Sequence, residues 1–261
     1  MKNLFSLQNR TALITGGSRG IGKMIAQGFL EYGAKVYISS RKADQCETAA
    51  EELSQFGHCK AIPQDVSTVE GCKILERAYG RHETSLDILV NNAGAAWGAE
   101  FDEFPESGWD KVMNLNVKSP FFLTQVFHER MKAAATKEKP GKVIMIASID
   151  GIRINPWETY SYQASKAALI HLTRRMAARL IKDNICVSGV APGAFASEMN
   201  RAARDHAGAV AAMVPAGRIG ADEDMAGVAI FLASRAGDYV VGDTIAVDGG
   251  VAYSSTGHFG G

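Results

Sequence analysis

A tyrosine and a lysine in the segment YSYQASK, residues 160–166, have the spacing of an acid–base pair on a helix. Residues i and i+4 of a helix share a face, so the side chains of Tyr162 and Lys166 should meet. Tyr160 is six positions before Lys166 and should point well away from it. A phenol has an ordinary pKa of about 10, which a neighbouring ammonium lowers by stabilising the phenolate. We therefore expect Tyr162 to exchange a proton with a ligand, although a lone Y-x3-K pattern also occurs on exposed helix faces.

Ser148 ends an apolar strand at 142–148, in the segment before this tyrosine. Parallel α/β sheets bind ligands outside the carboxyl ends of their strands. A hydroxyl at that edge can bond a substrate oxygen, and negative charge that develops on the oxygen needs a proton donor. Ser148 and Tyr162 together could bind a substrate oxygen and give it a proton. The alternative is that Ser148 only caps a turn.

A glycine-rich turn, TGGSRGIG at 15–22, follows the first apolar strand and leads directly into a helix. Glycines permit a tight turn, and the N–H groups of a helix N-terminus attract a pyrophosphate. A plain strand–helix turn is the alternative, but the position after the first strand favours dinucleotide binding. The cofactor-binding residues expected in this turn are Gly16, Ser18, Arg19, Gly20, Ile21 and Gly22.

The end of the second strand, ISSRK at 38–42, indicates which dinucleotide binds. Proteins that bind NAD usually place an acidic residue there to hold the ribose hydroxyls. Ser39 stands at that position, while Ser40 and Arg41 could bind a 2′-phosphate, with Arg19 approaching from the other side. We therefore expect NADP(H), although Arg41 could also be an ordinary surface charge.

Apolar segments alternate with amphipathic ones along the whole chain. Strands are predicted at 12–15, 35–39, 59–64, 86–91, 142–148, 185–192 and 244–249. Helices are predicted at 21–32, 43–56, 69–79, 117–136, 159–181 and 224–234. This alternation is typical of an α/β fold, a doubly wound parallel sheet of the Rossmann type with about seven strands and helices on both faces, forming one domain over residues 1–261. The segment 193–215 interrupts the alternation after a strand and is predicted to be a substrate lid.

Composition excludes several other classes of protein. The 28 lysines and arginines balance the 28 aspartates and glutamates, which argues against a general affinity for nucleic acid or an anionic membrane. The first residues, MKNLFSLQNR, lack the apolar core of a signal peptide, and no apolar run is long enough to span a membrane. The four cysteines have no C-x2-C spacing and the histidines have no metal-ligand spacing. We expect a cytoplasmic protein with no metal site.

Several motifs occur in the order that is typical of one family. The glycine turn is followed by Asp65-Val66, NNAG at 91–94, Asn116, Ser148, Tyr162 with Lys166, and Pro192-Gly193. The chain resembles the short-chain dehydrogenase/reductase family over essentially its whole length. The resemblance implies a catalytic set of Asn116, Ser148, Tyr162 and Lys166. In such a set Tyr162 and Lys166 also contact the cofactor, Lys166 through the nicotinamide ribose, and Asn116 holds a water that relays protons.

The resemblance also implies which residues contact the dinucleotide. Asp65 and Val66 would contact the adenine, and Ile146 with Pro192 and Gly193 would lie beside the nicotinamide. Ser197 stands where the family often has a threonine that binds the carboxamide, and it keeps the hydroxyl. The channel near the adenosine ribose would be lined by Asn91, Asn92, Ala93 and Gly94.

The sequence constrains the substrate less than it constrains the fold or the cofactor. An apolar wall is expected, or else a set of core residues, from Ala95, Ala96, Trp97, Ile149, Trp157, Phe195 and Met199. The segments VPAGRIG (214–220) and VDGG (247–250) resemble 3-oxoacyl-[acyl-carrier-protein] reductases, and residues 91–117 resemble the type found in rhamnolipid synthesis. This resemblance implies a reductase of 3-oxoacyl thioesters. The alternatives are a dehydrogenase of another ketone or alcohol, such as a sugar, steroid or polyol, and a non-catalytic NADP-binding regulator.

Two kinds of protein partner are also implied. An acyl carrier protein would need basic residues beside the cleft, although charged helix faces are usually only solvated. The family commonly forms tetramers through its two long helices and its last strand, so a homotetramer is expected. The candidate basic residues for carrier binding are Arg130, Lys132, Arg175, Arg179 and Lys182.

Overall fold

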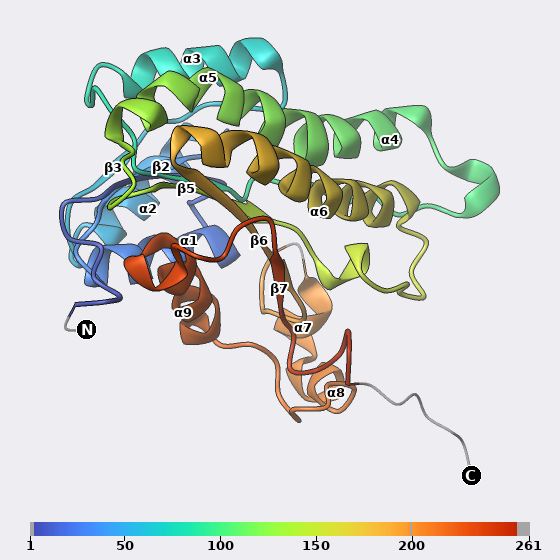
Figure 1. Cartoon of the computed structure of the whole chain (residues 1–261). Coiled ribbons are helices and arrows are strands. Elements are labelled where there is room, and N and C mark those ends of the chain that lie inside the picture. The colour runs from blue at the N-terminus through green and yellow to red at the C-terminus, as the bar shows by residue number, and fades with distance from the viewer. Residues whose placement is uncertain (1–2, 199, 255–261) are drawn as a thin grey trace.

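The computed structural model describes residues 3–198 and 200–254 and contains one parallel sheet of seven strands (Figure 1). The order across the sheet is β3-β2-β1-β4-β5-β6-β7, so the chain builds outward from β1 to one edge and from β4 to the other. This confirms the expected doubly wound α/β fold. The strands are β1 (Thr11–Thr15), β2 (Lys35–Ser39), β3 (Cys59–Ala61), β4 (Ile88–Asn91), β5 (Gly141–Ile146), β6 (Ile185–Pro192) and β7 (Thr244–Val247).

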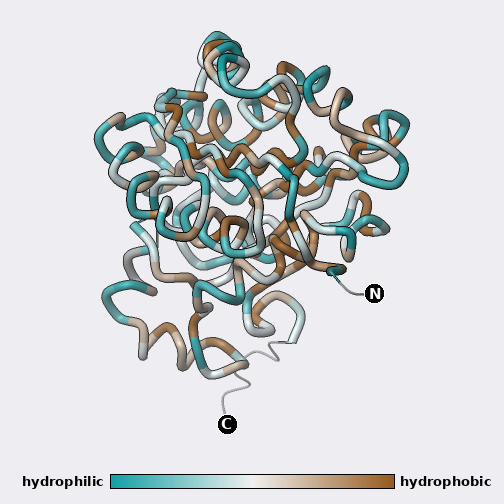
Figure 2. Tube along the Cα trace, turned by 90° about the vertical axis from the view of Figure 1, so that its left-hand side faces the viewer, coloured by the Kyte–Doolittle hydropathy of each residue, from teal (hydrophilic) through white to brown (hydrophobic). Residues whose placement is uncertain are grey.

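Helices cover both faces of the sheet, and each face has its own hydrophobic core (Figure 1). One core lies under α1 (Gly20–Glu31), α2 (Ala43–Leu53) and α9 (Asp222–Ala233). The other lies under α3 (Val69–Tyr79), α5 (Ser119–Ala134) and α6 (Tyr160–Leu180). Figure 2 shows the hydrophobic brown segments concentrated among the central strands. A sheet buried on both faces explains why the strands read as continuous apolar runs.

Several boundaries differ from the sequence-based expectation. β3 ends at Ala61 rather than at 64, because Pro63 has no N–H to donate to the ladder. The helix expected from 117 begins earlier: α4 (Glu106–Met113) continues through a π-helical turn at Asn114–Lys118 into α5. Only Gly108 and Val112 of α4 are buried, so its apolar pattern was too weak to predict a helix. The segment 193–215 holds two short helices, α7 (Arg201–Asp205) and α8 (Ala207–Ala211).

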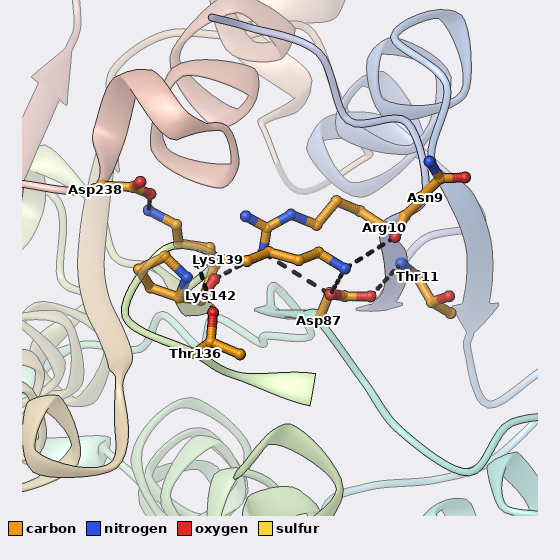
Figure 3. Close-up of polar contacts among 9 residues, drawn as sticks. Asn9, Arg10, Thr11, Asp87, Thr136, Lys139, Lys142 and Asp238 are labelled. Carbon is orange, nitrogen blue, oxygen red and sulfur yellow. Dashed lines mark hydrogen bonds and ion pairs between the residues drawn. The ribbon is translucent and has the colours of Figure 1, made fainter. Parts of the chain in front are cut away.

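A buried cluster of charges joins the amino ends of several strands, at the edge opposite the carboxyl ends (Figure 3). Asp87, just before β4, accepts hydrogen bonds from Thr11 N at 2.9 Å and pairs with Lys139 Nζ at 2.6 Å. Lys142 of β5 pairs with Asp238, just before β7, at 2.7 Å. The Arg10 guanidinium donates to the carbonyl of Pro140 at 2.7 Å. These bonds link the starts of β1, β4 and β5 to one another and to the connection between α9 and β7.

Removing Asp238 should destabilise the fold more than removing Lys142. The Lys142 side chain is 2% exposed, so Asp238→Ala leaves a buried ammonium without a counter-charge, and we expect a loss of about 3–5 kcal/mol in the free energy of unfolding. Lys142→Met leaves an aspartate that is 27% exposed and can be hydrated, with an expected loss below about 1.5 kcal/mol. Urea unfolding measures both. The double variant should resemble Lys142→Met, and equal losses in the two single variants would contradict this account.

Candidate active site

The amino-terminal turn of α6 brings Tyr162 and Lys166 together, as the spacing predicts. Lys166 Nζ lies 5.5 Å from the centroid of the Tyr162 ring. The same ammonium donates a hydrogen bond to the main-chain carbonyl of Ile146, at the end of β5, at 2.8 Å. Tyr160 instead turns outward, donates its hydroxyl proton to Glu158, and stacks edge-on against Phe101 and Phe104. The structure therefore places Tyr162, and not Tyr160, beside the lysine.

Burial dominates the protonation of this pair. It raises the pKa of Tyr162 to about 12, a shift that a hydrogen bond with Ser148 opposes and the charge of Asp150 enlarges. It lowers the pKa of Lys166 to about 8, and the charge of Asp150 opposes that shift. The pKa of Tyr162 thus lies above its ordinary value, not below it as expected beside an ammonium, because loss of hydration dominates and the Lys166 ammonium is bound to the Ile146 carbonyl.

Ser148 lies at the carboxyl end of β5, where the chain turns into a short 3-10 helix, η3 (Ile149–Gly151). Its hydroxyl oxygen accepts a hydrogen bond from the N–H of Asp150 at 3.1 Å. The serine therefore caps a turn, as the alternative reading allowed, and it also bonds Tyr162. Both can hold at once, because a hydroxyl that accepts from the turn keeps its own proton for another partner.

Asn116 lies in the π-helical turn and joins three segments. Its amide donates to the carbonyl of Ala95 and to the hydroxyl of Ser165, both at 2.9 Å, and its oxygen accepts from Ala95 N at 2.8 Å. A Cβ on Gly94 would be 3.3 Å from the Asn116 oxygen and 3.9 Å from Lys166 Nζ. The loop after β4, the π turn and the active face of α6 thus converge at Gly94. π turns inside helices occur frequently at functional sites.

The glycine turn has the geometry expected of a phosphate site. Gly16 and Gly20 have φ values of +66° and +50°, and a Cβ on Gly22 would be 2.3 Å from the Gly16 carbonyl oxygen. No side chain among the described residues caps the first turn of α1, so its N–H groups remain available. The turn is fastened to β4 by Asn92, whose amide donates to the carbonyls of Thr15 and Gly16 at 2.9 and 3.1 Å.

The end of β2 contrasts a buried serine with an exposed arginine. Ser39 is 1% exposed, and its hydroxyl has no hydrogen-bond partner within the part of the chain that the structure describes. Arg41 is exposed and borders a cavity of about 200 Å³, together with Lys111. Asp65, after β3, accepts a hydrogen bond from Ser67 N at 2.9 Å and is exposed. The remaining residues around this cavity are Ser67, Thr68, Ala95, Asn114 and Leu115.

Two of the expected cofactor contacts have their side chains in the core. Asn91 is 2% exposed, and its amide donates to Thr124 at 3.2 Å on the far side of the strand from the crevice. Val66 is 4% exposed and packs in the core under α3 and α5. Contacts of Asn91 and Val66 with the cofactor therefore stay a prediction and would have to be made by the main chain, whereas Ala93 and Gly94 lie in the loop at the carboxyl end of β4.

The segment after β6 lies over the glycine turn. Gly193 N donates to the carbonyl of Val247 at 3.0 Å, which fixes the end of β6 beside β7. A Cβ on Gly20 would be 3.2 Å from the Cβ of Ser197. The Ser197 hydroxyl accepts a hydrogen bond from Asn200 N at 3.0 Å. The expected lid thus begins directly above the expected phosphate site.

The apolar wall is only partly assembled as expected. Phe195 is 2% exposed and packs against Gly220, so of the two alternatives it is a core residue and not part of a pocket wall. Trp97 packs on Gly108 of α4, with Lys111 Nζ 5.1 Å from its ring centroid. Trp157 is exposed in the loop between η3 and α6, and Ile149 is half-buried in η3. Met199 lies outside the described residues.

The basic residues proposed for carrier binding lie at the carboxyl ends of α5 and α6. At about 1.5 Å per residue, Arg179 is about 20 Å along α6 from Lys166. Arg130 pairs with Glu76 at 2.6 Å, and Arg179 with Asp183 at 2.6 Å. Within one chain, these side chains do not border the cleft.

Sequence reasoning missed Asp150, whose charge acts on both Tyr162 and Lys166. Its position two residues after Ser148, in the turn at the carboxyl end of a strand, was the available signal. Among the residues described, no group of histidines, cysteines and acids could hold a metal ion. None of the described helices is long and apolar enough to cross a membrane.

Comparison with known proteins gives consistent matches over nearly the whole chain. A family profile described as "Enoyl-(Acyl carrier protein) reductase" matches residues 16–252. The rhamnolipids biosynthesis 3-oxoacyl-[acyl-carrier-protein] reductase of Pseudomonas aeruginosa is 47% identical over 96% of this chain and 99% of its own length. The 5-keto-D-gluconate 5-reductase of Escherichia coli K12 is 36% identical over 96% of this chain and 98% of its own length.

Solved structures agree with the fold. The active-site complex of Pseudomonas aeruginosa RhlG with NADP superposes with a TM-score of 0.93 at 46% identity, covering 97% of this chain and 100% of that one. A short-chain type dehydrogenase/reductase from Mycobacterium marinum superposes with a TM-score of 0.89 at 32% identity, covering 96% and 98%. With the motifs, the strand order and the converging side chains of Ser148, Tyr162 and Lys166, these matches show that the chain belongs to the short-chain dehydrogenase/reductase family.

Proposed function

We propose that this protein is an NADPH-dependent reductase of 3-oxoacyl thioesters, with Tyr162 as the proton donor. The observation that carries the proposal is the convergence of Ser148, Tyr162 and Lys166 at the carboxyl end of β5, beside a glycine turn suited to a dinucleotide. The 47% identity to a 3-oxoacyl-[acyl-carrier-protein] reductase supports the substrate class.

The residues at the ends of β1 and β2 fit NADP(H). Gly16, Gly20 and Gly22 leave room where side chains would collide with the turn, and the first N–H groups of α1 can bind the pyrophosphate. Ser39 leaves the end of β2 without the carboxylate that would repel a 2′-phosphate, and Arg41 can pair with that phosphate. When bound, this cofactor supplies a hydride to the carbonyl carbon.

The protein's own side chains orient the carbonyl group and donate the proton. The Ser148 hydroxyl accepts from Asp150 N, so its proton can point to the carbonyl oxygen and orient it. With its pKa raised to about 12, the phenol of Tyr162 is protonated at neutral pH and can give its proton to the far more basic alkoxide that forms. Lys166, held by the Ile146 carbonyl beneath the ring, stabilises the phenolate that remains. Asn116 positions the loop at Ala95 and helix α6 around this proton path.

Apolar side chains beside α6 suit a substrate with an alkyl chain. Ile154 is 85% exposed and Trp157 is 67% exposed, in the loop that leads into the tyrosine's helix. That loop is joined to the one after β4 by a hydrogen bond from Ala99 N to the carbonyl of Glu158 at 3.2 Å. Phe101 and Phe104 pack on Tyr160 at this junction. We propose that the segment 193–215 closes over the bound substrate as a lid.

A sugar-acid oxidoreductase is the second candidate, since relatives at 36–38% identity are named for gluconate derivatives. Such a substrate needs a cation for its carboxylate. Arg153 is the nearest arginine in sequence to Ser148, but its guanidinium donates to the carbonyls of Ile154 and Val251. This arrangement favours the thioester. A non-catalytic regulator is disfavoured, because it would have no need for a buried lysine beside a half-buried tyrosine.

We also propose a cytoplasmic homotetramer. All four cysteines lie in the described ranges and are buried, unpaired thiols, as is usual in a reducing compartment. Phe121 on α5 is 39% exposed, and β7 is an edge strand with half-buried side chains, so both expected contact surfaces offer apolar area. Whether an acyl carrier protein or coenzyme A presents the thioester is decided by the assay below.

Tyr162→Phe should lower kcat for carbonyl reduction by about 10²–10⁴-fold, because the ring keeps its packing but loses the transferable proton. Initial rates of NADPH oxidation measure this. Tyr160→Phe is the matched control on the same helix, since Tyr160 donates only to Glu158, and it should stay within about twofold of the wild type. Wild-type rates in Tyr162→Phe would show that another group donates the proton.

Arg41→Ala should lower kcat/KM for NADPH by about 10- to 100-fold and leave kcat/KM for NADH almost unchanged, because the variant loses a charge-assisted bond to the 2′-phosphate. The adjacent exposed Lys42→Ala provides the control, with a change below about threefold. A wild-type preference for NADH would overturn the assignment of Ser39 and Arg41.

Among 3-oxoacyl thioesters, kcat/KM should rise with chain length, as each methylene that leaves water contributes up to about 0.8 kcal/mol. The assay compares acetoacetyl and 3-oxodecanoyl thioesters, on coenzyme A and on acyl carrier protein, with 5-keto-gluconate and cyclic ketones. Trp157→Ala should lower the long-chain value about 3- to 10-fold and spare the short-chain one. Tyr239→Ala, which removes a fully exposed aromatic ring on the connection to β7, is the control. Turnover of 5-keto-gluconate and of no thioester would favour the second candidate.

A further inference from the structure

The turn after Ser148 carries an acidic residue into the site. Asp150 lies in η3, and its own N–H binds the Ser148 hydroxyl at 3.1 Å. The next residue, Gly151, contacts the backbone of α6 so closely that a Cβ there would be 2.5 Å from the main-chain carbon of Lys166. The backbone of the turn that carries Asp150 therefore lies between Ser148 on one side and the lysine's turn of α6 on the other. It is half-buried, so its charge is only partly screened by water.

Few other charges face this aspartate. The helix α6, which packs on η3, presents Tyr162 and Lys166. The loop that follows η3 presents Arg153, whose guanidinium binds the carbonyls of Ile154 and Val251. The strand β6, also in contact with η3, has Cys186 as its one ionisable side chain, near the end of the strand away from the site. In the C-terminal segment, Asp248 accepts from Gly250 N and Ala252 N.

We propose that Asp150 is a positioning residue of the proton-transfer site. Its negative charge favours the protonated form of Tyr162 and the charged form of Lys166, so that the proton donor remains protonated as the pH rises. This inference rests on the proposed role of Tyr162 and deepens it. Asp150 itself gives up no proton and makes no bond with the carbonyl.

The sign of the effect follows from the charges. A nearby carboxylate disfavours the phenolate and favours the ammonium, so it raises the pKa of both groups. For Lys166 it opposes the effect of burial, which alone would take the pKa further down. Asp150→Asn keeps the size of the side chain and the N–H that binds Ser148 but removes the charge. Both pKa values should then fall, so Tyr162 should lose its proton and Lys166 its positive charge at a lower pH.

The test is the pH profile of kcat/KM for reduction of a 3-oxoacyl thioester. In Asp150→Asn the alkaline limb should move to lower pH by roughly half a unit or more, since the profile reports the ionisations of the free enzyme. Asp150→Glu should restore the wild-type limb. Glu158→Gln is the matched control, an acid in the same loop whose charge acts on Tyr160, and it should leave the limb in place. A merely structural role for Asp150 would change the rate at every pH and leave the limb where it is.

A substrate-free measurement separates this inference from the proposed function. The ¹³C shift of ring-labelled tyrosine follows the titration of Tyr162, which Tyr162→Phe identifies, and it should begin at lower pH in Asp150→Asn than in the wild type. If no thioester is reduced but this titration moves, the substrate proposal is wrong and the role of Asp150 stands. If neither the titration nor the alkaline limb moves, Asp150 does not set the charge of the site.

Discussion

The pair of hydrogen bonds from the Asn92 amide to the carbonyls of Thr15 and Gly16 fastens the glycine turn to the end of β4, where the two halves of the sheet meet. The Thr15 hydroxyl strengthens the same junction by accepting from Asn92 N and Ala93 N at 3.1 Å. The strand order reverses between β1 and β4, so the loops that leave them diverge and open a crevice. Gly94 follows this junction directly and meets both Asn116 and Lys166. The alignment of the glycine turn with the tyrosine's helix therefore depends on a few bonds at one point.

Burial determines the protonation of Tyr162 and Lys166. Taking a phenol and an ammonium out of water disfavours the charged form of each, which moves their pKa values apart, to about 12 for Tyr162 and about 8 for Lys166. The Ile146 carbonyl compensates part of the lysine's lost hydration. The result is a phenol that holds its proton until a more basic oxygen forms beside it. An exposed Y-x3-K pair would have the same spacing without this property.

Much of the fold and the core of the site could be predicted from the sequence, because both depend on local patterns. Continuous apolar runs indicated the strands, and the spacing of Tyr162 and Lys166 indicated a shared helix face. Side chains near the ends of strands were harder to assign, since period-2 geometry alternates them between crevice and core. Asn91 and Phe195 turned out to be buried for this reason. Asp150 could not be assigned, because its effect depends on how closely Gly151 lets the turn approach α6.

The C-terminal segment touches two parts of the cleft that are distant in sequence. Val251 accepts a hydrogen bond from Arg153 in the loop before α6, and the carbonyl of Gly249 accepts one from Ala216 N at 3.0 Å, at the end of the lid segment. Gly249 also lies against Val214 and Ala216, where a Cβ would be 2.6 and 3.0 Å away. Residues 249–251 therefore connect the loop before the tyrosine's helix with the end of the segment proposed as a lid. A substitution at Gly249 or Val251 would therefore be expected to affect the loop before the tyrosine's helix and the proposed lid together.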